Sequence, residues 1–210
     1  MLPSFPPKLS AVAARALTRL GVELRLGTPV TQCDRERAVL GDERIDSRTL
    51  IWAAGVAASP AAAWLEVEPG RGGRVVVRPD LSLPEHPEIF VIGDTAQVEG
   101  PDGALPGVAP VAKQEGAYVA SVIAARVADT RPPGPFRYRN LGNLATIGRK
   151  EAVVDFGRLT LTGRVAWLVW GLAHIYFLIG FRNRMAVAVD WLWSYLTYQR
   201  GARLITGQEM

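Results

Sequence analysis

One short stretch, residues 88–96, constrains the fold more than any other part of the chain. Its apolar residues 89–92 form a run that is typical of a short buried strand, and the run ends at Gly93, with Asp94 directly after it. In an open α/β sheet, ligands lie just outside the carboxyl ends of the strands. Glycine there lets a ligand approach the backbone, and aspartate offers two acceptor oxygens to a polyol or a ribose. An ordinary Gly-Asp turn at a strand end is the alternative.

The composition predicts a globular protein whose chemistry, if it has any, comes from an organic cofactor. The chain has 210 residues, of which 49% are hydrophobic and 21% charged, and this is enough to form a core. Its one cysteine, Cys33, excludes an intrachain disulfide and a cysteine-based zinc or iron–sulfur site. Two histidines cannot supply a histidine-rich metal site. No resident metal is therefore predicted.

The positive charge of the chain is concentrated in its tail. From residue 158 onward, six arginines face two acids, and this excess equals the whole formal net charge of +4. A nucleic-acid-binding protein would spread its lysines and arginines over a wider surface, among exposed aromatic residues. No nucleic-acid partner is therefore predicted.

The pattern up to residue 73 predicts half of a nucleotide-binding domain. A helix is expected over residues 9–20, between a pair of prolines and Gly21, and a strand over residues 22–26. A hairpin follows around residues 34–37, and then a buried strand over residues 49–53 that ends before Gly55. Glycine at that place lets a nucleotide approach, although many strand ends use glycine and no Gly-x-Gly-x-x-Gly fingerprint is present.

Residues 74–140 add a short strand at 74–77, the central stretch, a turn-rich loop and a long helix from Pro110 to about Val127. Lys113 and Gln114 fall in the first turn of this helix, where unpaired N–H groups and a partial positive charge point outward. Together with Asp94 they would flank one cofactor, with a polyol at the strand end and an electron-accepting ring at the helix end. The alternative is an amphipathic helix with a solvated lysine.

The tail has an unusual composition. Two strands are expected over residues 143–148 and 152–156, followed by seventeen residues without a formal charge, 165–181, and a second apolar helix over residues 185–198. The uncharged run is shorter than the roughly 20 residues that cross a bilayer comfortably. Arginines at 164, 182, 184, 200 and 203, beside Trp and Tyr, favour helices that lie in a membrane interface with anionic lipid. A hydrophobic hairpin packed on the domain or on a twin subunit, and a true span, are the alternatives.

His174 lies inside this uncharged run, and no acid stands at helical spacing from it. A structural histidine is therefore favoured over a catalytic one.

Six motifs occur in a recognisable order along the chain. They are FPPKLS (5–10), LIWAAG (50–55), FVIGD (90–94), LPGVAPVAKQEG (105–116), NLATIGR (143–149) and HIYFLIGFRNR (174–184). In these motifs, over essentially all 210 residues, the chain resembles the C-terminal half of the type II NADH:quinone oxidoreductases. These are single-subunit, non-proton-pumping flavoproteins of the respiratory chain, within the FAD-dependent pyridine nucleotide oxidoreductases.

The resemblance implies an α/β fold, namely a partial Rossmann-like NADH/FAD-binding two-domain fold with a C-terminal amphipathic helical membrane-anchor region. Residues 1–73 would be the second half of the NADH-binding domain, and residues 74–140 the second segment of the FAD-binding domain. Residues 141–210 would form the C-terminal strands and membrane-associating helices. It also implies a peripheral protein on the cytoplasmic face of the cell membrane, held through residues 164–203, and allows a homodimer.

The resemblance implies that NADH passes a hydride to FAD and that the flavin then reduces a membrane quinone. No catalytic acid, base or nucleophile is required from the chain. Gly93 and Asp94 would hold the ribitol of FAD, and the helix that starts near Pro110 would face the pyrimidine edge of the flavin. The remaining cofactor-binding residues would be Ala112, Lys113 and Gln114 at the flavin and the quinone tunnel, and Gly55 at the nicotinamide.

The chain departs from the family pattern in three ways. Pro110 replaces a glutamine that is often assigned to quinone contact, and Leu141 stands where some members have a lysine near the flavin. In the family, both phosphate-binding fingerprints lie upstream of the segment that corresponds to this chain. The alternative is therefore a non-catalytic fragment, or a membrane-associated module that cannot hold FAD without the other half of the fold.

Overall fold

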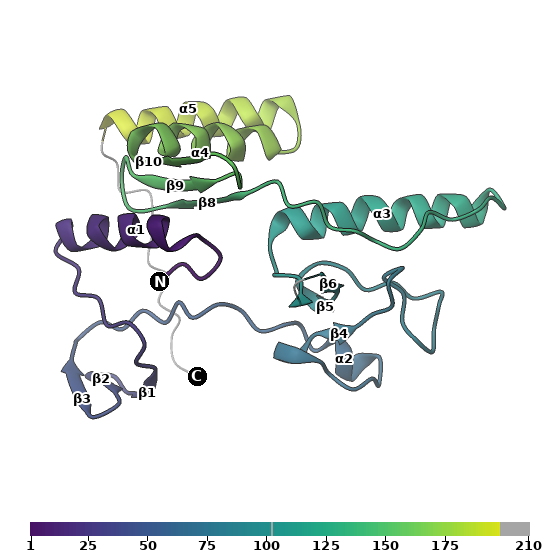
Figure 1. Ribbon diagram of the computed structural model, residues 1–210, viewed down its shortest axis with the longest axis horizontal. Coiled ribbons are helices and arrows are strands. Elements are labelled where there is room, and N and C mark those ends of the chain that lie inside the picture. The colour runs from purple at the N-terminus through teal and green to yellow at the C-terminus, as the bar shows by residue number, and fades with distance from the viewer. Residues whose placement is uncertain (102, 198–210) are drawn as a thin grey trace. The chain divides into compact units, whose positions relative to one another are not determined.

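The computed structural model describes residues 1–101 and 103–197 (Figure 1). The chain divides into two compact units, Met1–Pro29 with Gly142–Met210, and Val30–Leu141. Each unit combines helices and strands, so the α/β class is confirmed in the form of a mixed α/β fold. The division into segments 1–73, 74–140 and 141–210 stays a prediction. It is defined by the cofactor that each segment would bind, whereas the two units are defined by contacts within the chain.

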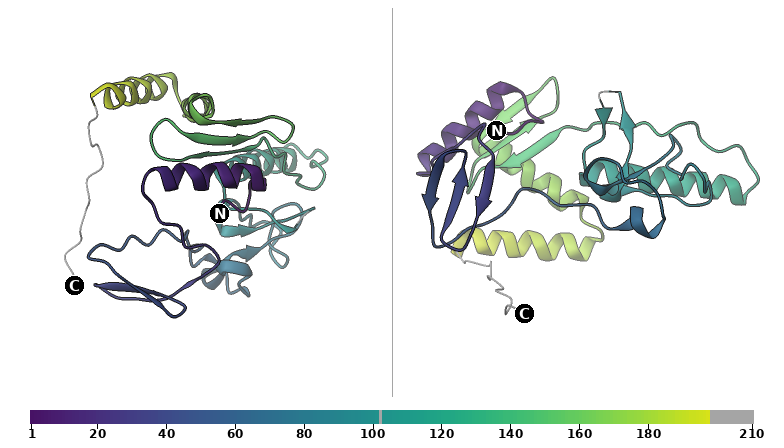
Figure 2. Two further views of the ribbon diagram at one scale, coloured as in Figure 1. Left: turned by 60° about the vertical axis from the view of Figure 1, so that its left-hand side comes forward. Right: turned by 90° about the horizontal axis from the view of Figure 1, so that it is seen from below.

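The first unit is a small sheet with a helix on each face (Figures 1 and 2). The antiparallel sheet has the order β10-β9-β8. Its elements are α1 (Pro7–Arg19), β8 (Asn143–Thr146), β9 (Ala152–Asp155), β10 (Thr160–Thr162) and α4 (Gly163–Phe177). Val153 packs with Leu9 of α1, whereas Val154 packs with Ala166 of α4. Because both faces of the central strand are covered, β9 is apolar without alternation, as its sequence shows.

Helix α1 agrees with its prediction, and its C-terminus shows why it stops. Gly21 has a φ of +83°, a left-handed conformation that glycine adopts without strain. The N–H of Gly21 donates to the carbonyl of Thr18, and the N–H of Val22 donates to that of Leu17. These two bonds form a Schellman motif, which satisfies carbonyls that the helix itself cannot pair.

Helices α4 and α5 (Phe181–Thr197) contact each other through aromatic side chains. The rings of Trp170 and Trp191 stack with centroids 5.5 Å apart, and the rings of Trp167 and Tyr195 lie 5.2 Å apart. His174 is exposed, hydrogen-bonds the carbonyl of Trp170 and lies against its ring, and its structural role stays a prediction. Most of the large apolar side chains of both helices remain exposed. Within the described ranges, no helix combines the length and apolarity that crossing a bilayer requires.

The second unit begins with a three-stranded meander of β1 (Val30–Cys33), β2 (Arg37–Leu40) and β3 (Glu43–Asp46). The predicted hairpin around residues 34–37 is confirmed. The carboxylate of Asp34 accepts the N–H groups of Glu36 and Arg37, so the turn is fixed by its own first residue. The third strand was not predicted.

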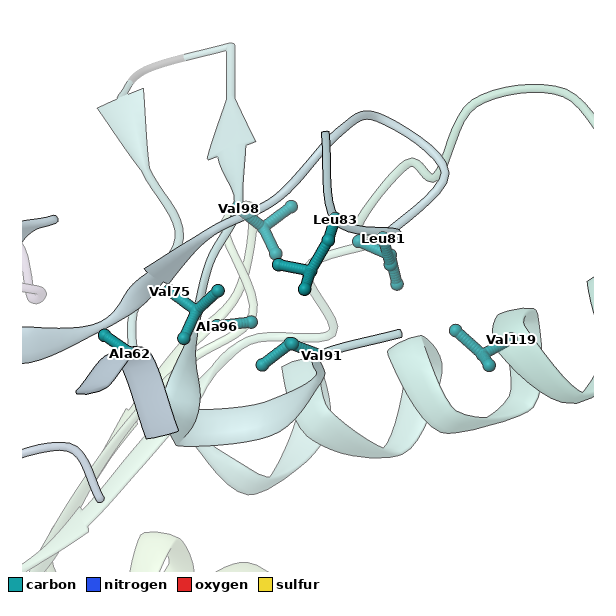
Figure 3. Close-up of a cluster of buried hydrophobic side chains, with 8 residues drawn as sticks. All are labelled: Ala62, Val75, Leu81, Leu83, Val91, Ala96, Val98 and Val119. Carbon is teal, nitrogen blue, oxygen red and sulfur yellow. The ribbon is translucent and has the colours of Figure 1, made fainter. Parts of the chain in front are cut away.

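The remainder of the second unit surrounds a small apolar core (Figure 3). Its elements are α2 (Ala61–Trp64), η1 (Arg71–Gly73), β4 (Val75–Val76), η2 (Gly93–Thr95), β5 (Ala96–Gln97), β6 (Glu99–Gly100), β7 (Gly103–Ala104) and α3 (Ala109–Val127). The core side chains are those of Ala62, Val75, Leu81, Leu83, Val91, Ala96, Val98 and Val119. Strands β4 and β5 pair in parallel, and α3 contributes Val119 to the core.

Three predicted strands, 22–26, 49–53 and 89–92, are wrong as secondary structure. The first two have no regular structure, and Ile51 is 81% exposed rather than buried. In the third, Phe90 forms an isolated bridge with Ser82, and Val91 is buried, but no strand results. A buried parallel strand needs neighbours that pair its N–H and C=O groups. Among the described residues, parallel strand pairing is confined to β4 and β5.

A buried carboxylate connects the Gly93 turn to α3. The side chain of Glu115 is 1% exposed, and its Oε2 accepts the backbone N–H of Gly93 at 2.5 Å. Gly93 has a φ of +70°, which favours glycine. Burial raises the pKa of Glu115, and the hydrogen bond from Gly93 opposes part of that rise. The conformation of η2 therefore depends on the residue that directly follows the predicted site residue Gln114.

Leu9→Ala should lower the free energy of unfolding by about 2–5 kcal/mol, because it opens a cavity between α1 and β9. Leu20→Ala, at a 64% exposed position directly after α1, should change it by less than about 0.5 kcal/mol. Urea unfolding of both variants measures the difference. Equal losses would contradict the packing of α1 on β9.

Glu115→Ala should destabilise the chain by about 1–3 kcal/mol, because the N–H of Gly93 loses its buried partner. Glu115→Gln keeps an acceptor and removes the titration. Since the pKa of Glu115 is raised, its contribution to stability is complete below the ordinary pKa of 4.5 and is lost as the pH rises through the raised value. Unfolding free energies across that pH window should therefore fall more steeply in the unsubstituted chain than in Glu115→Gln.

The exposed Glu85→Gln is the control, because it removes one carboxylate without altering the core. Its pH dependence should match that of the unsubstituted chain. If Glu115→Gln shows the same slope as well, Glu115 does not carry the effect.

Candidate functional site

The structure brings the central predicted residues together in the second unit, where η2 meets α3. A Cβ added to Gly93 would lie 3.6 Å from the Cβ of Ala112. One turn further on, a Cβ added to Gly116 would lie 3.8 Å from the side chain of Ile92. The backbone before Asp94 therefore lies against the first two turns of the helix.

Asp94 follows this contact and presents its carboxylate at the surface. No described residue donates a hydrogen bond to this carboxylate. A Cβ at Gly107 would lie 3.2 Å from its Oδ1 and 2.7 Å from Nη2 of Arg74, whose Nη1 donates to the carbonyl of Leu105. A side chain at residue 107 would therefore crowd the side chains of Arg74 and Asp94. Both carboxylate oxygens of Asp94 can accept hydroxyl groups.

Three charged groups lie around the Gly93 turn. Besides burial, the positive charge of Arg74 lowers the pKa of Glu115, whereas the negative charge of Asp94 raises it. The buried acid thus holds the backbone, and the exposed acid is left to accept a ligand. Two cavities of the described residues, of about 300 and 170 Å³, are not lined by any of these side chains.

The N-terminus of α3 offers fewer free donors than predicted. The N–H groups of Val111 and Ala112 both donate to the carbonyl of Val108, at 3.0 and 3.2 Å. Pro110 has no N–H, so Ala109 keeps the unpaired N–H of this turn among the described residues. The positive end of the helix dipole remains. It acts as a field rather than as a row of hydrogen-bond donors.

Gln114 has a structural task that the sequence did not reveal. Its Nε2 donates to the carbonyl of Arg139, and its Oε1 accepts the N–H of the same residue, both at 2.9 Å. The amide thus fastens the segment after α3 to the helix. Lys113 precedes it on the exposed side of the helix. The predicted roles of Lys113 and Gln114 at the flavin and the quinone stay predictions.

Gly55 is not joined to this group. It is exposed, has a φ of +100°, and no atom lies within 4 Å of the position that a Cβ would take. The backbone there is open to a ligand, but no described residue builds a site around it. Its assignment to the nicotinamide side stays a prediction.

Sequence reasoning missed three residues of the site: Arg74, Gly107 and Glu115. Of these, Glu115 left a signal, because it lies four residues from Val111 and from Val119 on the buried face of α3. An acid at a core position of an apolar stripe is rarely buried without a partner. Arg74 and Gly107 become recognisable only when the chain folds.

Two family models match the chain. Residues 1–116 match the pyridine nucleotide-disulphide oxidoreductase family, and residues 140–199 match the NDH2 C-terminal domain.

Curated relatives carry the same assignment. Type II NADH:quinone oxidoreductase Ndh of Mycobacterium tuberculosis is 41% identical, over 100% of this chain and 47% of its own length. The NdhA protein of the same organism is 39% identical over 99% of the chain and 46% of its own length. A Staphylococcus haemolyticus type II enzyme is 32% identical over 79% of the chain and 42% of its length. The chain thus spans about half the length of the first two relatives.

Solved structures show a shared fold at low identity. The structure of NDH2 from Plasmodium falciparum in complex with NADH has a TM-score of 0.77 at 16% identity. The match covers 92% of this chain and 55% of that one. The sulfide:quinone oxidoreductase of Aquifex aeolicus gives a TM-score of 0.58 at 13% identity, over 89% of this chain and 45% of that one. The chain therefore belongs to the pyridine nucleotide-disulphide oxidoreductase family and, within it, to the type II NADH:quinone oxidoreductases, of which it covers about half the length.

Proposed function

We propose that the chain is part of an FAD-dependent, non-proton-pumping NADH:quinone oxidoreductase of a respiratory chain. A hydride passes from NADH to FAD, and two electrons then pass to a membrane quinone. The flavin, when bound, supplies this redox chemistry, and the protein positions and tunes it. One observation supports the proposal most strongly: the Asp94 carboxylate is unpaired, and the bond from Gly93 to Glu115 fixes the backbone next to it.

The residues present fit the ribitol side of a flavin. Asp94 is exposed, and its carboxylate can accept hydrogen bonds from two hydroxyl groups of a polyol. Glu115 holds the turn in place while itself remaining buried. The positive end of the α3 dipole favours negative charge near its N-terminus, which is where the pyrimidine edge would lie.

The other cofactor residues are assigned by position. Ala112 is in contact distance of Gly93, so it would line the flavin, and Lys113 and Gln114 would follow toward the quinone. Since the Gln114 amide binds the backbone of Arg139, its contribution would include holding that segment beside the site. Gly55, with its open backbone, would border the nicotinamide.

The tail would bind the enzyme to the cytoplasmic face of the cell membrane as a peripheral protein, through residues 164–203. Residues 198–203 lie outside the described ranges. The exposed apolar side chains of α4 and α5 support this location, as do the arginines 164, 182 and 184. A homodimer that covers the same apolar surface is the competing arrangement.

A second candidate function is a membrane-associated module that does not hold FAD by itself. The exposed segment 49–53 favours it, because an apolar run with Ile51 81% exposed has no strand partner among the described residues. The two candidates differ in flavin content and not in membrane binding.

The purified protein should contain bound flavin and reduce a quinone with NADH. Asp94→Ala should weaken FAD binding about tenfold to a hundredfold, because a hydrogen bond to a charged group contributes about 1.5–3 kcal/mol. Asp94→Asn keeps one acceptor oxygen, so its affinity for FAD should lie between that of the unsubstituted protein and that of Asp94→Ala. Titration with FAD, followed by flavin fluorescence and visible absorbance, measures all three proteins.

Glu85→Gln is the matched control, since it also removes one exposed carboxylate of the second unit. It should keep full flavin affinity. Unchanged flavin affinity in Asp94→Ala would refute the ribitol assignment. A colourless protein that binds vesicles would favour the module over the enzyme.

Leu172→Glu combined with Leu192→Glu should weaken binding to vesicles at least about tenfold, because burying each leucine contributes about 1.5–3 kcal/mol. Both side chains are exposed, on α4 and α5. Val127→Glu places one such charge at an exposed position of α3 and should leave binding unchanged. Vesicle flotation measures the three proteins, and equal binding of all of them would exclude the tail as the membrane contact.

A further inference from the structure

A pocket of about 170 Å³ lies in the first unit, at the end of the sheet where the β8–β9 turn meets α4 and α5. It is lined by Lys150, Arg164, Trp167, Leu168 and Tyr195. The residues come from three elements that are far apart in sequence. None of them belongs to the candidate flavin site, which lies in the other unit.

Backbone pairing brings the two cations to the same end of the sheet. An isolated bridge joins Ala152 to Gly163, so Lys150, two residues before this bridge, and Arg164, one residue after it, lie beside each other. On α4, Trp167 and Leu168 stand three and four residues after Arg164 and therefore share its side of the helix.

Arg149, the residue before Lys150, binds the end of α5. Its Nη2 donates to the carbonyls of Ser194 and Tyr195, at 2.9 and 3.0 Å, and so caps the last turn of that helix. Its guanidinium also lies over the ring of Tyr195. Arg149 thus holds Tyr195, an aromatic residue that lines the pocket, through hydrogen bonds to the backbone and a contact with the ring.

The two lining cations have no acidic partner among the described residues. The neighbouring acid, Glu151, pairs instead with Arg19 at 2.8 Å. Lys150 places its Nζ 5.4 Å from the ring centroid of Tyr195, and neither Lys150 nor Arg164 forms an ion pair within the described ranges. Two cations therefore face one pocket without a counter-charge.

The backbone of Lys150 supports a role for its side chain. Its φ is +71°, in the left-handed region that residues with a Cβ adopt at an energetic cost. Glycine would suit this turn position better, as it does at Gly148 in the same turn. The strained backbone therefore makes Lys150 a candidate functional position.

We propose that this pocket binds the phosphate of an anionic phospholipid headgroup. Two cations can form charge-assisted hydrogen bonds to a phosphodiester, and Trp and Tyr are typical of the headgroup level of a membrane. The apolar rim at Leu168 continues along α4 to the exposed Leu172, which offers a path for the acyl chains. A soluble phosphate ester shares the headgroup chemistry, but it would make no use of that apolar rim. The inference rests on the proposed membrane location and adds a specific lipid site to it.

The test compares two doubly substituted chains that lose the same charge. Lys150→Gln with Arg164→Gln removes the pocket cations, whereas Arg15→Gln with Arg158→Gln removes two exposed cations of the same unit elsewhere. Vesicles of phosphatidylcholine with phosphatidylglycerol should bind the pocket variant about 30-fold more weakly than the unsubstituted chain. Each cation near the lipid surface contributes about 1 kcal/mol, and every 1.4 kcal/mol is about a factor of ten in affinity. The control should lose less than about threefold.

Headgroup chemistry is tested with vesicles in which oleate replaces phosphatidylglycerol at the same zeta potential. The unsubstituted chain should bind the phospholipid vesicles more tightly, and the pocket variant should bind both equally. Glycerol 3-phosphate, at the concentration of the lipid phosphate, should displace little of the bound protein. Complete displacement by it would assign the pocket to a soluble ester and overturn the lipid assignment.

Lys150→Gly separates binding from folding. It relieves the left-handed backbone, so its thermal midpoint should equal or exceed that of the unsubstituted chain, while its binding to phosphatidylglycerol vesicles falls. Equal binding losses in the pocket variant and the control would overturn this inference alone. Failure of the unsubstituted chain to bind any vesicle would overturn the membrane proposal and this inference with it.

Discussion

The hydrogen bond from the Gly93 N–H to the Glu115 carboxylate determines the geometry of the candidate site. It joins a left-handed glycine turn to the second turn of α3, where the side chain of Glu115 is buried. Burying an acid is costly unless it is hydrogen-bonded, and here burial does raise the pKa of Glu115. The bond offsets part of that cost. Asp94, directly after the turn, is thereby held at the surface with its carboxylate free.

A different constraint governs the first unit. Strand β9 is buried on both faces, with Val153 toward α1 and Val154 toward α4, so two segments from opposite ends of the sequence share one strand. The sheet in turn positions the start of α4 and the β8–β9 turn. The pocket between Lys150 and Arg164 therefore follows from the packing of this strand, and its charge follows from Glu151 being paired elsewhere.

Prediction was reliable where the signal is local. Three such signals were confirmed: the proline and glycine at the two ends of α1, the proline at the start of α3, and the turn at Asp34. Each of them acts within a few residues. Prediction failed for the strands at 49–53 and 89–92, because a strand exists only when a distant segment pairs with it. Their apolar composition was read correctly, but it could not show which residues would become their neighbours.

The sequence by itself determined the family, the helices and the position of Asp94 after Gly93, because these depend on motifs and on local stereochemistry. Only the tertiary structure decided what surrounds them. Glu115 became the partner of Gly93, Gln114 became a clamp for Arg139, and most donors of the α3 N-terminus became engaged. Each of these contacts joins groups whose distance is fixed by packing rather than by spacing along the chain.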